Sequence, residues 1–302
     1  AAVPEPLGEG IYKFDSENIP SKVSSAKTII LTGEWGTADF QKLSVAIGNN
    51  TGFPPAGNST IEEVDMSKAK ITPGTDLNVP IGFSNYGVFR GLKSLKKVEM
   101  PLAEEAAHFS NMKGAFQNCT KLEAIDMTGC TGVTKLTDTF FGCENLKEVN
   151  LSNCNSLGTS QPTESTFDHC TGLETVILPA SFTWSDYIFG SCTSLRTIDW
   201  SRYSSAKAPQ LEDQKLKDYM FQYIDNLKTI KLLVPSAAYN SFMTDSQWSQ
   251  LDIQTATSTG INCIRLKPIN VIYTLNGLRV DEKQVKHNGV YIMNGKKVMV
   301  RK

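Results

Sequence analysis

Several residue patterns that mark common active sites are missing from this sequence. It contains only three histidines in 302 residues, namely His108, His169 and His287. It has no Gly-x-Ser-x-Gly or His-Glu-x-x-His motif, no glycine-rich phosphate loop and no Cys-x-x-Cys pair. Its acidic residues stand in no pattern typical of paired acid–base catalysis. We therefore expect a protein that is not an enzyme and that needs no metal ion or cofactor.

Charge and hydropathy argue against two classes of partner. The net charge is −1 and the isoelectric point is about 6.4, so no basic field is present to hold nucleic acid. No apolar run approaches the roughly 20 residues that a membrane-spanning helix needs. The first residues, Ala1 to Pro6, include neither an initiator Met nor a signal peptide. We interpret them as the trimmed start of an exported chain or as an arbitrary boundary.

A sequence repeat runs through the middle of the chain. When a Phe is taken as position 1, apolar residues recur at positions 4, 7, 10 and 12. The six copies begin at Phe89, Phe116, Phe140, Phe167, Phe189 and Phe221. A spacing of three is typical of tight helical or 3-10 turns, and the alternation of positions 10 and 12 is typical of a short strand. One copy cannot bury its apolar face alone, so the copies are expected to stack into ladders.

These patterns predict an α+β repeat solenoid, because most of the intervals fall within the range of leucine-rich repeats, about 20–29 residues. We expect a right-handed solenoid with one short strand and one short helical or 3-10 turn in each repeat. Three regions follow: an N-terminal segment (1–25), the solenoid with its terminal caps (26–253) and a small β-hairpin module (254–302). The module is inferred from Asn276-Gly277 and Asn294-Gly295, which each separate two alternating runs.

Two helices are expected in the caps of the solenoid. Asp39 is predicted to cap a helix that reaches Ile47, with Gly48 ending it. Ser236 is predicted to cap a second helix that extends to about Trp248.

The cysteines fit the repeat better than they fit disulfides. Cys119, Cys143, Cys170 and Cys192 all occupy position 4, where the other two copies carry Leu92 and Ile224. A position that accepts Cys, Leu or Ile is an apolar packing site, and we expect free, buried thiols there. The neighbouring pair His169-Cys170 suggests a Cys–His nucleophile, but packing in the ladder is the preferred interpretation.

Two surfaces are candidates for binding a partner. Positions 9 and 11 should face outward from the sheet, from Lys97 and Glu99 in the first copy to Thr229 and Lys231 in the sixth. This column is mixed and mildly acidic, and it has no aromatic stripe. The second candidate is a group of aromatic residues near the fifth and sixth copies, and its ligand-binding members would be Trp184, Tyr187, Trp200, Tyr203 and Tyr219. The alternatives are a solvated face and packing in a widened coil.

The unit Phe-x-x-Cys-x-x-Leu-x-x-Ile-x-Leu resembles the BspA-like leucine-rich repeats of bacterial surface proteins, over about residues 26 to 253. This resemblance implies export, display at the cell surface and adhesion to a protein partner, such as extracellular matrix or another bacterial surface protein. The tail from Tyr273 to Val298 is similar to the C-terminal sorting modules of the type IX secretion route. A plain β cap is the alternative for the tail.

We therefore expect a non-catalytic binding or adhesion protein at the cell surface or outside the cell. It should bind no nucleic acid and should have no membrane-spanning segment. A glycan-binding or nutrient-capture protein is one alternative, which exposed, coplanar rings of Trp184, Trp200 and Tyr203 would favour. A structural spacer without a ligand is the other.

Overall fold

The computed structural model describes residues 8–48, 60–157, 163–180, 182, 187–211 and 215–256, together with the backbone of four short strands further on. The chain divides into two compact units, residues 1–255 and residues 256–302. The division lies two residues from the boundary that the sequence indicated between 253 and 254.

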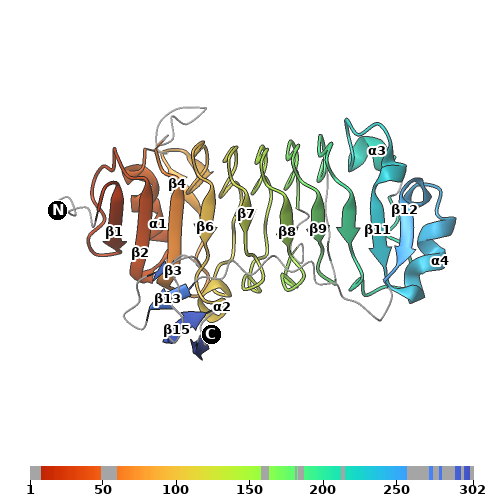
Figure 1. Cartoon of the computed structure of the whole chain (residues 1–302). Helices are drawn as coiled ribbons and strands as arrows, with labels where there is room; N and C mark the ends of the chain where they lie inside the picture. Colours follow the sequence, from red (N-terminus) through yellow and green to blue (C-terminus); the bar gives the residue numbers. More distant parts are fainter. Residues whose placement is uncertain are drawn as a thin grey trace. The chain divides into compact units, whose positions relative to one another are not determined.

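The first unit is a repeat solenoid built on one parallel sheet, whose strands follow one another along the chain (Figure 1). Each strand pairs only with the strands of the neighbouring coils, because every coil contributes a single strand to the sheet. The ten strands, in sheet order, are β1 (Ile11–Asp15), β2 (Thr28–Trp35), β3 (Glu63–Ile71), β6 (Lys97–Glu99), β7 (Ala124–Ile125), β8 (Glu148–Asn150), β9 (Thr175–Ile177), β10 (Thr197–Asp199), β11 (Lys231–Val234) and β12 (Asp252–Thr255).

The solenoid begins earlier in the chain than the sequence indicated. β1 lies in the segment that was expected to precede the solenoid, yet it pairs with β2 over its whole length, from Ile11 opposite Thr28 to Asp15 opposite Thr32. This first coil lacks the Phe of the repeat, and that is why the pattern did not reveal it. At the other end, β12 adds a further strand where only a closing segment was expected.

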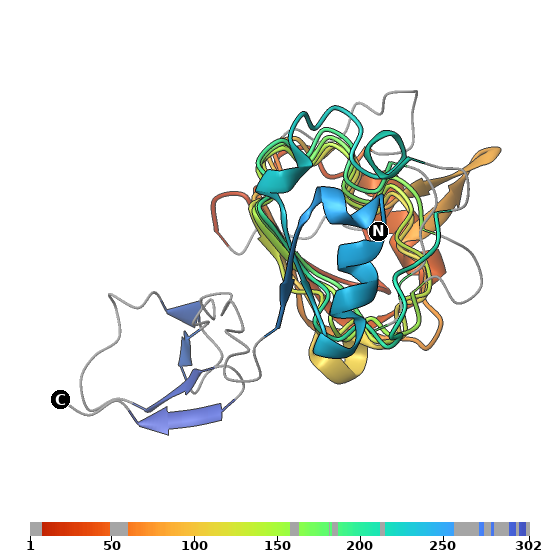
Figure 2. The same cartoon turned by 90° about the vertical axis from the view of Figure 1, so that its right-hand side faces the viewer.

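Hydrogen bonds inside each coil explain the spacing of three. In the third copy, Cys143 N donates to Phe140 O at 2.9 Å, and Leu146 N donates to Cys143 O at 3.1 Å. Each bond closes a single 3-10-type turn, so successive ladder positions point to the same interior. The coils repeat so closely that they nearly superimpose when the solenoid is viewed along its length (Figure 2).

The six repeat phenylalanines form a continuous buried ladder. All six are at most 1% exposed. Their rings stack on the ring of the next coil, with centroids 5.5–6.0 Å apart and planes within 17° of parallel. Such offset contacts add to the free energy gained by burying each ring. The predicted Phe ladder is therefore confirmed.

A ladder of buried thiols runs beside the rings, as predicted. The Sγ of Cys119, Cys143, Cys170 and Cys192 each donates to the carbonyl oxygen of the repeat Phe in the preceding coil, at 2.9–3.2 Å. Cysteine suits this position because it is a small apolar residue that also carries a weak donor. The six cysteines in the described residues are all free and buried; Cys263 lies outside those residues.

The six repeat copies also contain left-handed backbone positions that were not predicted. They lie two residues before and two residues after the repeat Phe. Within the described residues, every non-glycine residue with positive φ occupies one of these positions. The seven are Asn118, Asp138, Ser165, His169, Tyr187, Ser191 and Tyr223. Such a backbone is unusual for a bulky side chain, so Tyr187 and Tyr223 stand out.

The helices of the caps differ slightly from those predicted. α1 (Thr37–Ala46) begins three residues earlier than expected, with Gly36 rather than Asp39 as its N-cap, and the Asp39 carboxylate accepts a hydrogen bond from Gly36 N within the first turn. α4 (Ser236–Thr244) ends before Trp248, which starts a separate 3-10 turn, η2 (Trp248–Gln250). The remaining elements of the first unit are α2 (Ala103–Ala106), α3 (Leu216–Tyr219), η1 (Leu227–Thr229) and the hairpin of β4 (Asn78–Ile81) and β5 (Ser84–Gly87).

The second unit contains a four-stranded antiparallel sheet in the order β14-β13-β15-β16. Its strands are β13 (Ile272–Thr274), β14 (Arg279–Val280), β15 (Val290–Met293) and β16 (Lys296–Met299). β15 and β16 pair on either side of Asn294-Gly295, and β13 and β14 pair on either side of Asn276-Gly277. The two Asn-Gly pairs themselves lie outside the described residues.

Candidate functional site

The strands from β3 to β12 present a row of side chains on the outer surface of the parallel sheet, which we call the sheet face. Along these strands, buried side chains that point into the core alternate with side chains that are at least partly exposed. The sheet face consists of Glu63, Asp65, Lys97, Glu99, Ala124, Asp126, Glu148, Asn150, Thr175, Ile177, Thr197, Asp199, Lys231, Leu233, Asp252 and Gln254.

The sixth repeat enters the sheet face in a different register from the one predicted. Thr197 of β10 pairs with Lys231 of β11, and Asp199 pairs with Leu233. The outward pair is therefore Lys231 and Leu233, so the prediction was right for Lys231 and wrong for Thr229, which lies in η1. The reason is η1, which inserts an extra 3-10 turn before the strand and moves it by two residues.

Charges at the first strands of the sheet face compensate one another. Lys97 lies between two carboxylates and forms ion pairs with both Glu63, at 3.1 Å, and Glu99. All three side chains are partly buried, so this arrangement is better shielded from salt than a fully exposed pair.

Several acidic positions on the sheet face close the turn that follows their strand. Asp126 Oδ1 accepts from both Thr128 N and Thr128 Oγ1, at 2.9 and 2.6 Å. Asp199 Oδ1 likewise accepts from Ser201 N at 2.9 Å. The same contact joins Asp65 to Ser67 and Asn150 to Ser152. The sequence signal for this turn is an Asp or Asn two residues before a Ser or Thr, and these turns were not predicted.

Glu148 lies near the middle of the sheet face and differs from these residues. Its neighbours at the same register are Ala124 of β7 and Thr175 of β9, and neither carries a charge. One of its carboxylate oxygens, Oε1, is buried and has no hydrogen-bond partner in the part of the chain that the structure describes. Burial raises the pKa of Glu148 above its ordinary value. The fold therefore holds a partly desolvated carboxylate at this point without compensating it.

The predicted aromatic site is only partly at the surface. Trp200 is 1% exposed, and its Nε1 donates to Pro179 O at 2.9 Å. Tyr203 packs against it with ring centroids 4.4 Å apart, and the Tyr203 hydroxyl donates to Lys207 O at 2.8 Å. The location of Trp200 favours the packing alternative for this residue, because a ring in the core offers no face to a ligand. Trp184 lies outside the described residues.

Tyr187 and Tyr219 lie on adjacent coils, where Tyr187 N donates to Tyr219 O at 2.7 Å. Tyr187 is 39% exposed, and Tyr219 is partly buried against the core. Tyr223, two residues after the Phe221 of the sixth repeat, is 69% exposed and also has a left-handed backbone. Tyr187, Tyr219 and Tyr223 all lie outside the strands of the sheet face, and we treat them as a second, smaller candidate, the tyrosine surface.

The neighbouring His169 and Cys170 are not arranged as a nucleophilic pair. The His169 Nδ1 atom contacts Asp168 Oδ1 at 2.8 Å, and its ring packs against Phe141 at 5.2 Å. The Cys170 thiol points the other way, into the core, where burial raises its pKa far above the ordinary value. A thiol held in its neutral form is a poor nucleophile.

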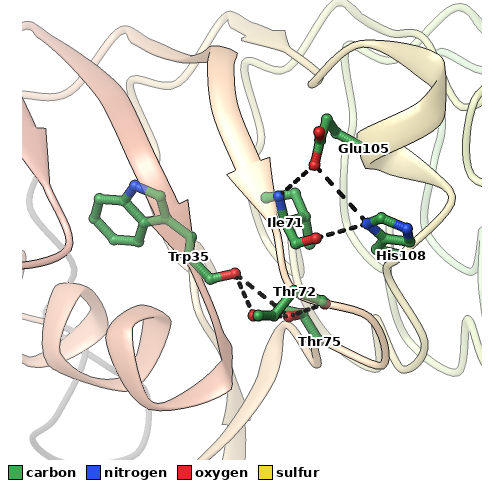
Figure 3. A network of polar contacts seen from close by, with 6 residues as sticks. All are labelled: Trp35, Ile71, Thr72, Thr75, Glu105 and His108. Atoms are coloured by element: carbon green, nitrogen blue, oxygen red, sulfur yellow. Dashed lines mark hydrogen bonds and ion pairs between the residues drawn. The ribbon is translucent and has the colours of Figure 1, made fainter.

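His108 belongs to a network that supports the long strand β3 (Figure 3). β3 extends beyond the end of its pairing with β6, which involves only Glu63 to Asp65. Near its far end, Glu105 Oε2 accepts from Ile71 N at 2.7 Å, and His108 Nδ1 contacts Ile71 O at 2.6 Å. These two side chains bind the N–H and the carbonyl oxygen of Ile71, which a neighbouring strand would otherwise pair. We therefore interpret the network as structural.

The residues that the structure describes contain no cluster of three or more His, Cys, Asp and Glu side chains able to hold a metal ion. None of the helices in this part of the chain has the length and hydropathy needed to cross a bilayer.

The comparison with known families agrees with this architecture. The BspA type leucine rich repeat region, in six copies, matches three overlapping stretches, residues 83–196, 112–240 and 161–263. The chain belongs to the BspA-type leucine-rich-repeat family. Together the stretches cover more than half of this BspA-type protein and include all six repeat phenylalanines. The family supports a protein-interaction repeat domain. A search of curated proteins gives no significant match.

Proposed function

We propose that this protein is a non-catalytic binding module that acts outside the cell or at its surface, where the sheet face contacts a protein partner. Extracellular-matrix proteins and the surface proteins of other bacteria are the expected partners. The observation that carries the proposal is the sheet face itself, which forms a continuous row of partly exposed side chains across eight successive strands.

The construction of the solenoid supports this role. Parallel pairing joins each strand to the strand of the next coil, and the stacked Phe and Cys ladders hold the coils together from inside. Side chains on the sheet face can therefore vary without loss of the fold. A rigid surface also loses little conformational entropy when a partner binds.

The alternatives receive less support from the geometry. The glycan alternative was tied to exposed, coplanar rings of Trp184, Trp200 and Tyr203, but Trp200 is buried and the ring of Tyr203 packs against it. The exposed rings of Tyr187 and Tyr223 lie outside the sheet face. The sheet face has no aromatic residue among its members. The spacer alternative predicts that no partner binds the sheet face, and the experiment below distinguishes this alternative from the proposed binding function.

The test is a binding screen of the purified chain against a panel of extracellular-matrix proteins, bacterial surface proteins and polysaccharides. For any protein that binds, the affinity is then measured for both the native chain and the double variant Thr175→Arg/Thr197→Arg. These two threonines face each other at the same register on β9 and β10, so the two arginines would cover the centre of the sheet face. The matched control is Glu104→Arg on α2, which changes the net charge by the same two units at an exposed site.

We expect at least one protein to bind, and we expect the double variant to weaken its binding more than tenfold while Glu104→Arg changes it less than twofold. Equal effects of the two variants would show that another surface makes the contact. Binding only to polysaccharides would replace the proposal with the glycan alternative, and an empty screen would favour the spacer.

A further inference from the structure

The near-neutral net charge of the chain conceals an acidic solenoid. Residues 1–255 carry 29 acidic and 21 basic side chains, which gives a net charge of −8. Residues 256–302 carry nine basic and two acidic side chains, so most of the compensating charge lies outside the solenoid sequence. The partner of an acidic solenoid is expected to be cationic only if the acidic charge reaches the binding surface uncompensated.

One row of charges on the solenoid is compensated within the row itself. The residue just before each strand forms a corner row, which alternates in sign from coil to coil: Glu62, Lys96, Glu123, Lys147, Glu174 and Arg196. Neighbours in this row are joined through the backbone, and ion pairs form between Lys96 and Glu62 at 2.8 Å and between Lys147 and Glu174 at 3.5 Å. The charges of the corner row therefore largely cancel, and the row contributes little to the electrostatic potential at the surface.

The sheet face beside the corner row does not follow this pattern. Asp126, Glu148 and Asp199 form no ion pair with any basic residue in the described part of the chain. A second, independent observation singles out Glu148, since its buried Oε1 atom has no donor there. Because Oε1 itself is buried while the Glu148 side chain is partly exposed, an ammonium or guanidinium group of a partner would meet the exposed part of this carboxylate, or Oε1 after the side chain rotates, and would offset its desolvation.

We propose that the sheet face between β7 and β10 binds an extended, Lys- or Arg-bearing segment of a partner protein, with one basic side chain on Glu148 and others on Asp126 and Asp199. This proposal rests on the proposed function and adds the chemical class of the partner. β7 and β10 are three strand spacings apart, about 14 Å. Side chains at i and i+4 of an extended segment span a similar distance, about 13 Å, so basic residues at i and i+4 match Asp126 and Asp199, which share one register. Glu148 lies on the strand next to β7 and two residues earlier in register, so the long basic side chain at i+2 has to extend along the strand to reach it.

The test uses the full chain and a fluorescently labelled peptide in which Lys and Ser alternate over ten residues. Fluorescence anisotropy in 50 mM and 300 mM NaCl measures its affinity, and a Glu/Ser peptide of equal length serves as the negative probe. The test variant is Asp126→Asn/Glu148→Gln/Asp199→Asn, in which each Asn keeps the oxygen that closes its turn. The matched control is Glu62→Gln/Glu123→Gln/Glu174→Gln, which removes the same charge from the corner row.

We expect the Lys/Ser peptide to bind, to weaken in higher salt and to bind at least tenfold more weakly to the test variant, with less than a threefold change in the control. Equal losses in both variants would mean that only net charge attracts the peptide and would overturn the proposal. Failure of the peptide to bind in 50 mM NaCl would overturn it as well. The proposed function is tested separately. If a protein partner binds the native chain but not the variant Thr175→Arg/Thr197→Arg, the proposed function stands even when the peptide experiment fails.

Discussion

Two adjacent phenylalanines in the third copy allow a sharp test of the ladder. Phe140 is fully buried and stacks on Phe116 and Phe167, with ring centroids 6.0 and 5.7 Å away. Phe141, the next residue, is only partly buried and contacts the ring of His169. The two residues have the same chemistry and nearly the same place in the chain, so they differ mainly in their packing.

Phe140→Ala should lower the free energy of unfolding by about 3–5 kcal/mol, the usual cost of emptying a buried phenylalanine site. We expect a value near the upper end, because each lost ring stack adds about 0.5–1.5 kcal/mol. Phe141→Ala should cost about 1 kcal/mol or less, as is common at a partly exposed position. Guanidinium titration followed by circular dichroism, with the midpoint and the slope reported for each variant, would measure both changes.

The comparison between the two variants decides the outcome. If the two variants lost the same stability, the stacked ladder would not be the main source of cohesion between coils. A broad, multi-step transition in Phe140→Ala alone would still agree with the account, because coils interact only with their neighbours and a break at one coil can uncouple the two sides.

Three further predictions concern single contacts. Cys170→Ala should destabilise the fold by about 0.5–1.5 kcal/mol, because it removes a buried sulfur and its weak hydrogen bond, although Cys143 N still donates to Phe140 O. The native thiol should react with a disulfide reagent at pH 8 only after unfolding, because burial raises its pKa. Asp199→Ala should cost about 0.5–1.5 kcal/mol in a thermal or denaturant melt, whereas Asp199→Asn should cost little, since it keeps the turn. Burial raises the pKa of Glu148, so the folded state binds its proton more tightly than the unfolded state does, and this group lowers stability as the pH rises from about 4 towards 7. Glu148→Gln should therefore be slightly more stable than the native chain at pH 7 and should lose that advantage at pH 4; a loss of stability at pH 7 would contradict the desolvation argument.

The repeat explains why much of the solenoid could be predicted. Every copy places a Phe, then a Cys, Leu or Ile, then a Leu and finally two apolar residues, at positions 10 and 12, and all of these residues except the partly buried Met100 lie in the core. Prediction failed where a local insertion changed the register, as η1 does before Lys231. It also failed for β1, because this strand is stabilised by pairing with β2 and carries no repeat motif of its own.

The candidate site was harder to predict than the fold. Trp200 was considered as a ligand-binding residue because tryptophan is common at interfaces, but position 12 of the repeat points into the core, and this position is occupied by Trp200 in the fifth copy. Glu148 has no charged neighbour at its register because Ala124 and Thr175 stand there. Both are distant from it in the sequence and lie beside it only because their strands pair. Side chains of neighbouring coils therefore decide which charges stay uncompensated.

The central claim, that the sheet face contacts a protein partner, is tested most directly by photo-crosslinking. A benzoylphenylalanine residue would replace Thr197 on the sheet face, Tyr223 on the tyrosine surface or Glu104 on α2 in three separate chains, each irradiated with a protein identified in the screen. The account predicts a covalent adduct from the replacement at Thr197 and none from the replacement at Glu104. An adduct from Tyr223 or Glu104 but not from Thr197 would contradict it.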